Sequence, residues 1–312
     1  MSQGRREYQE DALVTDFPVG EDTGLVVLAD GMGGHAAGDV ASNIVVTEVY
    51  GALKRSAASF LTDANAIPEM LSRAAARANA SVRDHVKTNP QTEGMGATLV
   101  ALSMIGDRMF WNSIGDSPLY LLRNGKLRQL NEDHSMAPQI DMMVQAGLLD
   151  ADAAKNHPDR NCLTSVIFGQ KVPKVDCPND PFHLEAGDIV VVSSDGLQFL
   201  EEPTIERILN KNRKRQASEI AGILLNALEN LREPNQDNIS FAIVKVNHTA
   251  AVRADPVMAM PAERPLAATR LADMSKLADL AQGLFSSKGK TTQQAAPRGS
   301  GNAAEERFVS GS

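Results

Sequence analysis

Short apolar runs alternate with amphipathic stretches along residues 1–248. The apolar, partly β-branched run Leu25-Val26-Val27-Leu28-Ala29 predicts a buried strand. Over 38–54, apolar residues recur at helical spacing, which predicts a helix with one buried face. A second helix is predicted over about 66–87, where Ala and Arg are frequent. The pattern therefore begins with a strand that is followed by two helices.

Two hairpins follow in the pattern. Strand-like residues 98–104 and 108–114 flank the turn Ile105-Gly106-Asp107. Strand-like residues 119–123 and 126–130 flank Asn124-Gly125, a strong short-range signal for a hairpin. Consecutive hairpins pair their strands antiparallel, so this pattern argues against a doubly wound parallel sheet.

The remainder of residues 1–248 mixes both kinds of element. A helix is predicted over 135–147, an irregular segment over 148–182 and a buried strand over 189–193. A helix over about 216–231 precedes a last strand over 239–246. Strands bracketed by helices predict an α+β fold of two packed antiparallel β-sheets flanked by helices, an α-β-β-α sandwich.

The composition changes after Asn247. Residues 249–312 are rich in Ala, Pro, Gln, Ser and Gly, which predicts a disordered, low-complexity tail behind a folded domain over 1–248. A short helix is predicted within the tail over about 266–285. Its apolar stripe consists of Leu271, Met274, Leu277, Ala281 and Leu284. Three interpretations stay open: the stripe docks on a protein partner, packs back on the body, or reflects composition alone.

The distribution of charge narrows the choice of partners. The chain of 312 residues has 31 Lys and Arg and 39 Asp and Glu, a net charge of −8. Residues 249–312 hold 8 of the basic and 6 of the acidic residues, which leaves 23 and 33, a net of −10, for residues 1–248. An acidic body argues against nucleic acid as a partner, because phosphate backbones attract clustered Lys and Arg. It suits a solubilising surface, or carboxylates gathered around cations.

The sequence shows no pattern of a targeting or membrane-spanning segment. No apolar run approaches the roughly 18 residues that a spanning helix needs. The charged stretch Met1-Ser2-Gln3-Gly4-Arg5-Arg6-Glu7 has no apolar segment after it. The two cysteines are Cys162 and Cys177. We therefore expect no membrane partner, and a cytoplasmic location in which both thiols stay reduced.

Glycines surround an aspartate in the stretch Ala29-Asp30-Gly31-Met32-Gly33-Gly34-His35. An aspartate that leaves a buried strand into glycines places a carboxylate where bare backbone can approach a small ligand. The spacing Gly33-x4-Gly38 is that of a phosphate-binding P-loop, but Asp39 stands where that motif needs lysine. Since a carboxylate there repels phosphate, the stretch argues against a nucleotide-binding loop.

Further acidic residues stand at the ends of predicted strands. Asp195 and Asp116 follow apolar strands, Asp237 comes just before one, and Glu10-Asp11 lies near the start. Each of these sites alone is most simply a turn. Because strand ends tend to gather at one rim of a sandwich, together they predict a cluster of carboxylates. Oxygen ligands without histidine suit Mg²⁺ or Mn²⁺ and argue against zinc.

In this order, the segments resemble the metal-dependent protein phosphatase family of the protein phosphatase 2C type. The matching segments span residues 6–240: Arg6-x3-Glu10-Asp11, Ala29-Asp30-Gly31-Met32-Gly33-Gly34-His35, Gly94-Met95-Gly96-Ala97-Thr98, Ile114-Gly115-Asp116-Ser117, Glu132-Asp133-His134-Ser135, His157-Pro158-x-Arg160-Asn161, Ser194-Asp195-Gly196 and Asp237-Asn238-Ile239-Ser240. The resemblance implies two antiparallel sheets flanked by helices, with a binuclear metal centre at one edge between them. It also implies that segment 135–182 forms a flap beside the site.

The resemblance assigns residues to that centre. Asp30 is implied to bridge two ions, Mn²⁺ or Mg²⁺, and the Gly31 carbonyl group to contact one of them. The other implied ligands are Asp195 and Asp237 in the first site, Glu10 and Asp11 in the second, and Asp116, which with Asp195 can hold a weaker third ion. Arg6 matches the arginine that binds substrate phosphate, since a guanidinium group can form two parallel hydrogen bonds with such an anion.

By this resemblance the chain is an enzyme, a serine/threonine protein phosphatase that uses a metal-activated water to hydrolyse phosphoserine or phosphothreonine. Asp30 and Arg6 are its expected catalytic residues, and no protein nucleophile is needed. The expected partners are phosphorylated proteins, and a bacterial Ser/Thr kinase whose action the enzyme opposes. One alternative is a catalytically weak regulatory binding module, which would need a missing ligand. The other is a small-molecule phosphomonoesterase with the same site.

Several residues depart from the family pattern near the predicted site. Met32 stands where animal members carry a histidine, so the leaving-group proton is expected to come from water. Ser117-Pro118 replaces a Ser-Arg pair and Ser165 replaces an arginine, which removes two positive charges. Gln9 stands where Asn is frequent. His134 is interpreted as a hydrogen-bonding turn residue rather than a catalyst.

Overall fold

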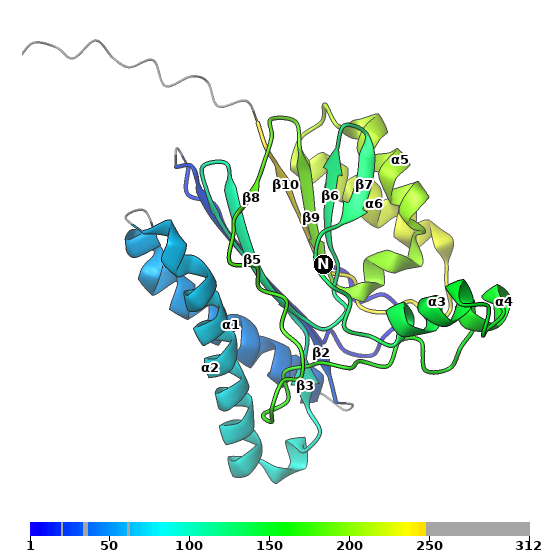
Figure 1. The fold of residues 1–312 in the computed structure, drawn as a ribbon, viewed down its shortest axis with the longest axis horizontal. Coiled ribbons are helices and arrows are strands. Elements are labelled where there is room, and N and C mark those ends of the chain that lie inside the picture. The colour runs from blue at the N-terminus through cyan, green and yellow to red at the C-terminus, as the bar shows by residue number, and fades with distance from the viewer. Residues whose placement is uncertain (20, 34–36, 61–62, 248–312) are drawn as a thin grey trace, which may run out of the picture. The chain divides into compact units, whose positions relative to one another are not determined.

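The fold is that of a computed structural model, which describes residues 1–19, 21–33, 37–60 and 63–247 (Figure 1). Gly34 and His35 of the glycine-rich motif lie outside these described residues. The predicted tail, 249–312, and the helix predicted over about 266–285 also lie outside them.

Six antiparallel strands form the first sheet. They are β1 (Asp11–Asp16), β2 (Thr23–Met32), β3 (Gly96–Ala97), β4 (Leu99–Ile105), β5 (Arg108–Ile114) and β8 (Phe182–His183). The order across the sheet is β1-β2-β4-β5-β8, and the short β3 pairs with the end of β2. Strand β2 is therefore paired along both edges, which fixes the position of Asp30 near its end.

Four antiparallel strands form the second sheet, in the order β10-β9-β6-β7. Their bounds are β6 (Leu119–Arg123), β7 (Lys126–Gln129), β9 (Ile189–Ser193) and β10 (Phe241–Lys245). The β6–β7 hairpin turns at Asn124 and Gly125, whose φ angles are 52° and 81°. Positive φ at both positions is the geometry that favours Asn-Gly in tight hairpins, so the sequence signal has a direct structural cause.

Three apolar layers hold the sheets and helices together (Figure 1). Along β2, Val27 and Ala29 face the helices, whereas Val26 and Leu28 face the second sheet. Helices α1 (Ala37–Phe60) and α2 (Ile67–Thr88) cover the outer face of the first sheet, and α5 (Glu202–Asn212) and α6 (Ala217–Leu231) cover that of the second. The predicted α+β sandwich is confirmed.

The structure also corrects the prediction in places. Strand β1 and helix α5 were not predicted, because Asp11–Asp16 mixes polar and apolar residues and α5 buries few large side chains. Segment 148–182, predicted to be irregular, contains helix α4 (Ala151–Lys155). Helix α3 (Ala137–Gln145) lies within the helix predicted over 135–147. Short 3₁₀ turns occur at Ala64–Ala66, Pro90–Thr92 and Asp195–Phe199.

All described residues belong to one compact unit. None of the helices within the described ranges is long and apolar enough to cross a bilayer.

Candidate metal centre

The predicted acidic residues meet in one cleft of about 540 Å³. Its lining includes all but one of the predicted site residues: Arg6, Glu10, Asp30, Gly31, Asp116, Asp195 and Asp237. Asn161, Cys162, Leu163 and Val166 also line it, so segment 135–182 borders the cleft. Asp11 does not line the cleft. It is 5% exposed, and its carboxylate accepts a hydrogen bond from the Ser194 hydroxyl at 2.9 Å.

Strand pairing brings these side chains together from distant parts of the sequence. Asp11 at the start of β1 is the antiparallel partner of Asp30 near the end of β2. Asp195 lies two residues after the end of β9, at the start of a 3₁₀ turn. Asp237 precedes β10, whose residues pair with β9. Each carboxylate therefore stands at a strand end at the same edge of the sandwich, as the pattern of Asp-Gly turns predicted.

Backbone packs tightly around Gly31. A Cβ atom at this position would collide with the carbonyl oxygen of Gly38, at the start of α1, and would lie 2.6 Å from that of Glu10. The Gly31 amide donates to the Glu10 carbonyl group at 3.1 Å. Glycine is required here because no side chain fits between β2, α1 and the residues before β1. The position of helix α1 is thus tied directly to the backbone of the cleft.

Burial and mutual repulsion raise the pKa values of Asp11, Asp30 and Asp195. The pKa of Asp30 lies well above its ordinary value because of burial and the neighbouring Asp11, Asp195 and Asp116. Burial, offset in part by serine hydroxyl groups, raises the pKa of Asp11 to about 6. Burial and Asp237 raise the pKa of Asp195 to about 6. The cleft is therefore an unfavourable place for ionised carboxylates without a compensating cation.

Arg6 is the positively charged side chain that lines this cleft in the described part of the chain. Its Nη2 lies 2.5 Å from Asp237 Oδ2, and this hydrogen bond raises the pKa of the guanidinium group. The side chain is 55% exposed. Arg6 can therefore contact a solute in the cleft while Asp237 holds one end of its guanidinium group.

The donor set fits divalent cations. Asp195 Oδ1 in the lining of the cleft is buried without a hydrogen-bond partner in the described structure, and so is Oδ1 of Asp11, the strand partner of Asp30. Carboxylate and carbonyl oxygens of this kind are the ligands that Mg²⁺ and Mn²⁺ prefer. Within the described ranges, no three Asp, Glu, His and Cys side chains are already arranged as metal ligands. Asp237 instead forms an ion pair with Arg6.

Neutral polar residues that the sequence did not assign to a role position the acidic ones. Asn238 accepts a hydrogen bond from the Glu10 amide at 2.7 Å and donates to the carbonyl groups of Gln3 and Tyr8, both at 2.9 Å. Thr98 accepts from the Asp30 amide at 3.0 Å and shares a 2.8 Å hydrogen bond with Ser117. Thr98 and Asn238 lay within the matched motifs, but the pattern gave no signal of these contacts.

The buried His134 holds the turn before Asp116. Its Nδ1 accepts from the Gly115 amide at 3.2 Å, and the His134 amide donates to the Gly115 carbonyl group at 3.1 Å. Burial lowers the pKa of His134, which keeps Nδ1 free to accept. This geometry matches the predicted turn role. Ser165, which stands where the family often has arginine, bonds to the Lys174 backbone instead.

Comparisons with known proteins point the same way. The family model described as protein phosphatase 2C matches residues 3–232. The serine/threonine phosphatase stp of Listeria innocua is 34% identical over 224 residues, covering 72% of this chain and 84% of that one. The crystal structure of the Mycobacterium tuberculosis serine/threonine phosphatase PstP/Ppp aligns with a TM-score of 0.63 at 30% identity, covering 79% of this chain and 96% of that one.

A further solved structure bears on the metal. It is the catalytic domain of the serine/threonine protein phosphatase PstP in complex with 2 manganese ions. It aligns with a TM-score of 0.59 at 27% identity, and the match covers 78% of this chain and 93% of that one.

In the metal-free protein, Asp116→Asn should stabilise the fold increasingly as the pH rises. Burial, reinforced by Asp195 and Asp133, raises the pKa of Asp116 from 3.8 to about 7. The stability that this carboxyl group contributes is fully present below pH 3.8 and is lost as the pH rises through 7. Between these two pH values the free energy of unfolding falls by about 1.4 kcal/mol for each pH unit. Asparagine does not ionise and therefore avoids this loss.

Urea unfolding in a chelator, at several pH values from about 4 to about 8, measures this difference. The exposed Asp84→Asn is the matched control. Lys87 and Arg83 lower the pKa of Asp84, so its removal should not become stabilising with rising pH. A stability difference between Asp116→Asn and wild type that stays flat over this range contradicts the prediction.

Proposed function

The chain belongs to the protein phosphatase 2C family, and on this premise we propose that it removes phosphate from phosphoserine and phosphothreonine in proteins. The resemblance seen in the sequence is thereby confirmed. The observation that supports the activity best is the cleft itself, in which buried carboxylates with raised pKa values converge beside a half-exposed arginine. Such a site suits cations and a phosphate ester together.

Each side chain of the cleft has a role in this reaction. When bound, divalent cations supply an acidified water as the nucleophile and positive charge next to the phosphoryl group. Asp30, Asp195 and Asp237 would hold them. Arg6, anchored by Asp237, presents its remaining N–H groups to the phosphate oxygens. Met32 lines the cleft without a proton to donate, so the leaving-group proton comes from solvent.

The proposed centre holds two ions, Mn²⁺ or Mg²⁺, with Glu10 and Asp11 serving the second directly or through water. The Gly31 carbonyl group would contact one ion, and Asp116 with Asp195 would hold a weaker third. The support is the all-oxygen donor set and the two manganese ions in the structure of a relative. Asp11 lies behind the cleft rather than in its lining, which favours an indirect role.

A cytoplasmic setting, opposite a Ser/Thr kinase that phosphorylates the same proteins, fits this activity. The free thiols of Cys162 and Cys177 support a reducing compartment. The alternative of a binding module without activity lacks support, because no predicted carboxylate ligand is missing. The other alternative, a small-molecule phosphomonoesterase, differs from a protein phosphatase only in its substrate. An assay that compares small phosphate esters with phosphoproteins distinguishes the two.

The activity should require a divalent cation and Asp30. With Mn²⁺ or Mg²⁺, the protein should dephosphorylate a phosphothreonine peptide, and a chelator should abolish turnover because the carboxylates alone supply no nucleophile. Asp30→Asn should lower kcat/KM at least about a hundredfold, about 2.7 kcal/mol, while circular dichroism shows an intact fold. The exposed Asp180→Asn is the control. Full activity in chelator, or turnover of small phosphate esters without that of phosphoproteins, would count against the proposal.

Arg6 should contribute to phosphate binding beyond any general effect of positive charge. Arg6→Ala should lower kcat/KM about tenfold to a hundredfold, because it removes charge-assisted hydrogen bonds to the phosphoryl oxygens. Arg5→Ala changes the same charge at the adjacent, exposed position and should leave kcat/KM within about twofold. Equal losses in the two variants contradict a specific role for Arg6.

The tail should be dispensable for chemistry. We propose that its apolar stripe, Leu271 to Leu284, docks on a protein partner and recruits the phosphatase to it. A chain that ends at Asn247 should keep kcat/KM on a short phosphopeptide but act more slowly on phosphoproteins in a cell extract. A tenfold loss on the peptide, about 1.4 kcal/mol, contradicts dispensability. Equal rates on every natural phosphoprotein contradict recruitment.

A further inference from the structure

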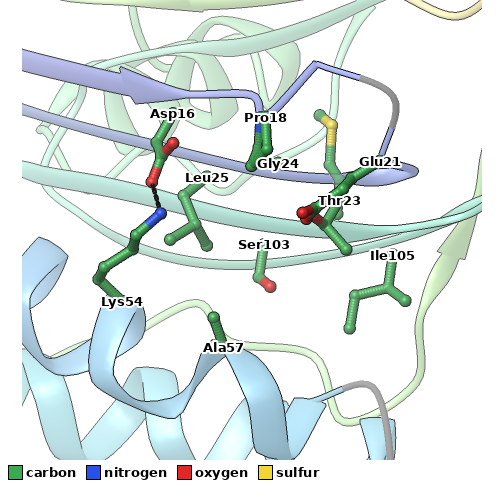
Figure 2. A pocket seen from close by; sticks show the side chains of 11 residues that line it. Asp16, Pro18, Glu21, Thr23, Gly24, Leu25, Lys54, Ala57, Ser103 and Ile105 are labelled. Atoms are coloured by element: carbon green, nitrogen blue, oxygen red, sulfur yellow. Dashed lines mark hydrogen bonds and ion pairs between the residues drawn. The ribbon is translucent and has the colours of Figure 1, made fainter.

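A second cavity lies away from the metal centre, between the first sheet and the C-terminal half of α1 (Figure 2). Its volume is about 210 Å³. Figure 2 shows Leu25, Ser103 and Ile105 on the sheet side, and Lys54 and Ala57 on the helix side. Leu25 on β2 and Ser103 on β4 are antiparallel partners, so they form one flat wall.

Two small side chains leave this space open. The buried face of α1 repeats every four residues through Ala41, Val45, Val49 and Leu53. The next position in that series is Ala57, and Ser103 stands on the wall opposite. A large apolar residue at either position would complete the packing between helix and sheet. The sequence places alanine and serine there instead.

The Ser103 hydroxyl group lacks a partner. The residue is 1% exposed, and its side chain forms no hydrogen bond with the part of the chain that the structure describes. Figure 2 shows the hydroxyl group pointing from the sheet toward the helix, into the cavity. The Ser103 oxygen is not among the fully buried side-chain atoms that lack a partner, and the residue lines the cavity, so the polar group of a ligand in the cavity can reach this hydroxyl group.

The charges at the rim select against an anion. Asp16 accepts hydrogen bonds from Lys54 Nζ at 2.6 Å and from the Tyr50 hydroxyl at 3.0 Å. These bonds lower the pKa of Asp16, which keeps it ionised, and the Lys54 charge is already paired. Glu21 adds a second carboxylate, which accepts from the Thr23 hydroxyl at 3.1 Å. The rim therefore favours a neutral or cationic group over a negative one.

We propose that this cavity is a second ligand site, for a monocyclic aromatic molecule that carries a short hydroxyl or amino group. An apolar cavity of roughly 150 Å³ admits benzene, and 210 Å³ leaves room for one substituent. The ring packs against Leu25, Ile105 and Ala57, while the polar group bonds to Ser103. No part of this binding step depends on the phosphatase activity.

The elements that form the cavity also form the metal centre. Strand β1 runs from Asp11 to Asp16, and β2 runs from the cavity at Leu25 to Asp30. Helix α1 has Ala57 in the cavity, and its first turn packs on Gly31. Because one helix reaches both places, we extend the proposal to coupling: a ligand that displaces α1 at Ala57 would also displace its first turn at Gly31 and so alter cation binding. The effect of this coupling on turnover rests on the proposed function.

Three probes with one ring test the site: benzyl alcohol, benzylamine and benzoate. Methyl-detected NMR titration of the full chain, without added metal, should show the alcohol and the amine binding at least tenfold more tightly than benzoate. Ala57→Leu fills the cavity and should abolish binding, whereas Ala76→Leu, at an exposed position of α2, should not. Ser103→Ala should weaken the alcohol about threefold to tenfold. If Ala57→Leu does not fold, Ser103→Leu fills the same space.

The site is overturned if no probe shifts the methyl signals of Leu25 and Ile105 at millimolar concentration. Equal affinity for all three probes, or binding that survives both cavity-filling variants, overturns it as well. Coupling is measured as the dissociation constant of Mn²⁺ with and without saturating benzyl alcohol, and a ratio of one overturns the coupling. A protein that binds the probes but lacks phosphatase activity contradicts the proposed function alone. An active phosphatase that binds no probe contradicts this site alone.

Discussion

Repulsion among half-buried and buried carboxylates is the constraint on which the cleft depends. Asp11, Asp30, Asp116, Asp195 and Asp237 act on one another, and burial removes the water that would screen them. Arg6 is the positive side chain in the lining of the cleft among the described residues, so protein charges leave most of this repulsion in place. The metal-free fold therefore holds these carboxylates near one another at an energetic cost, although among the described residues no three of them are yet arranged as metal ligands.

The sandwich supplies the force that keeps these groups together. Each strand that ends at the cleft is anchored by apolar layers on both of its faces, as Val26 and Val27 show on β2. If the strands could slide or splay, the carboxylates would separate and regain water. Packing across three layers prevents this, because a shift of one residue would turn every core side chain of β2 to the opposite layer. The free energy gained by burying the apolar core thus offsets the repulsion among the carboxylates at the cleft.

Those parts of this arrangement that depend on neighbouring residues alone could be predicted from the sequence. The Asn124-Gly125 hairpin and the Asp-Gly turns are set by the conformations that single residues allow, so they are visible in the pattern. Helix α5 was missed because its stability comes from packing Ile205 and Leu209 on the second sheet rather than from a long apolar stripe. The contacts of Asn238 with residues near the N-terminus join distant segments, and no local pattern carries them. The assignment of individual metal ligands stays a prediction from the family resemblance.

The cleft and the second cavity depart from good packing in different ways. At the cleft, excess charge is held together by the fold. At the second cavity, Ala57 and Ser103 stand where the surrounding pattern would accept larger apolar residues. Residues that lower the stability of a fold and form no compensating contact tend to mark functional positions. Helix α1 borders both the cleft and the cavity. Its first turn packs against Gly31, and its C-terminal half lines the cavity. One helix therefore borders both the cavity that we propose as a ligand site and the backbone of the acidic cleft, which is the geometry that coupling between the two sites requires.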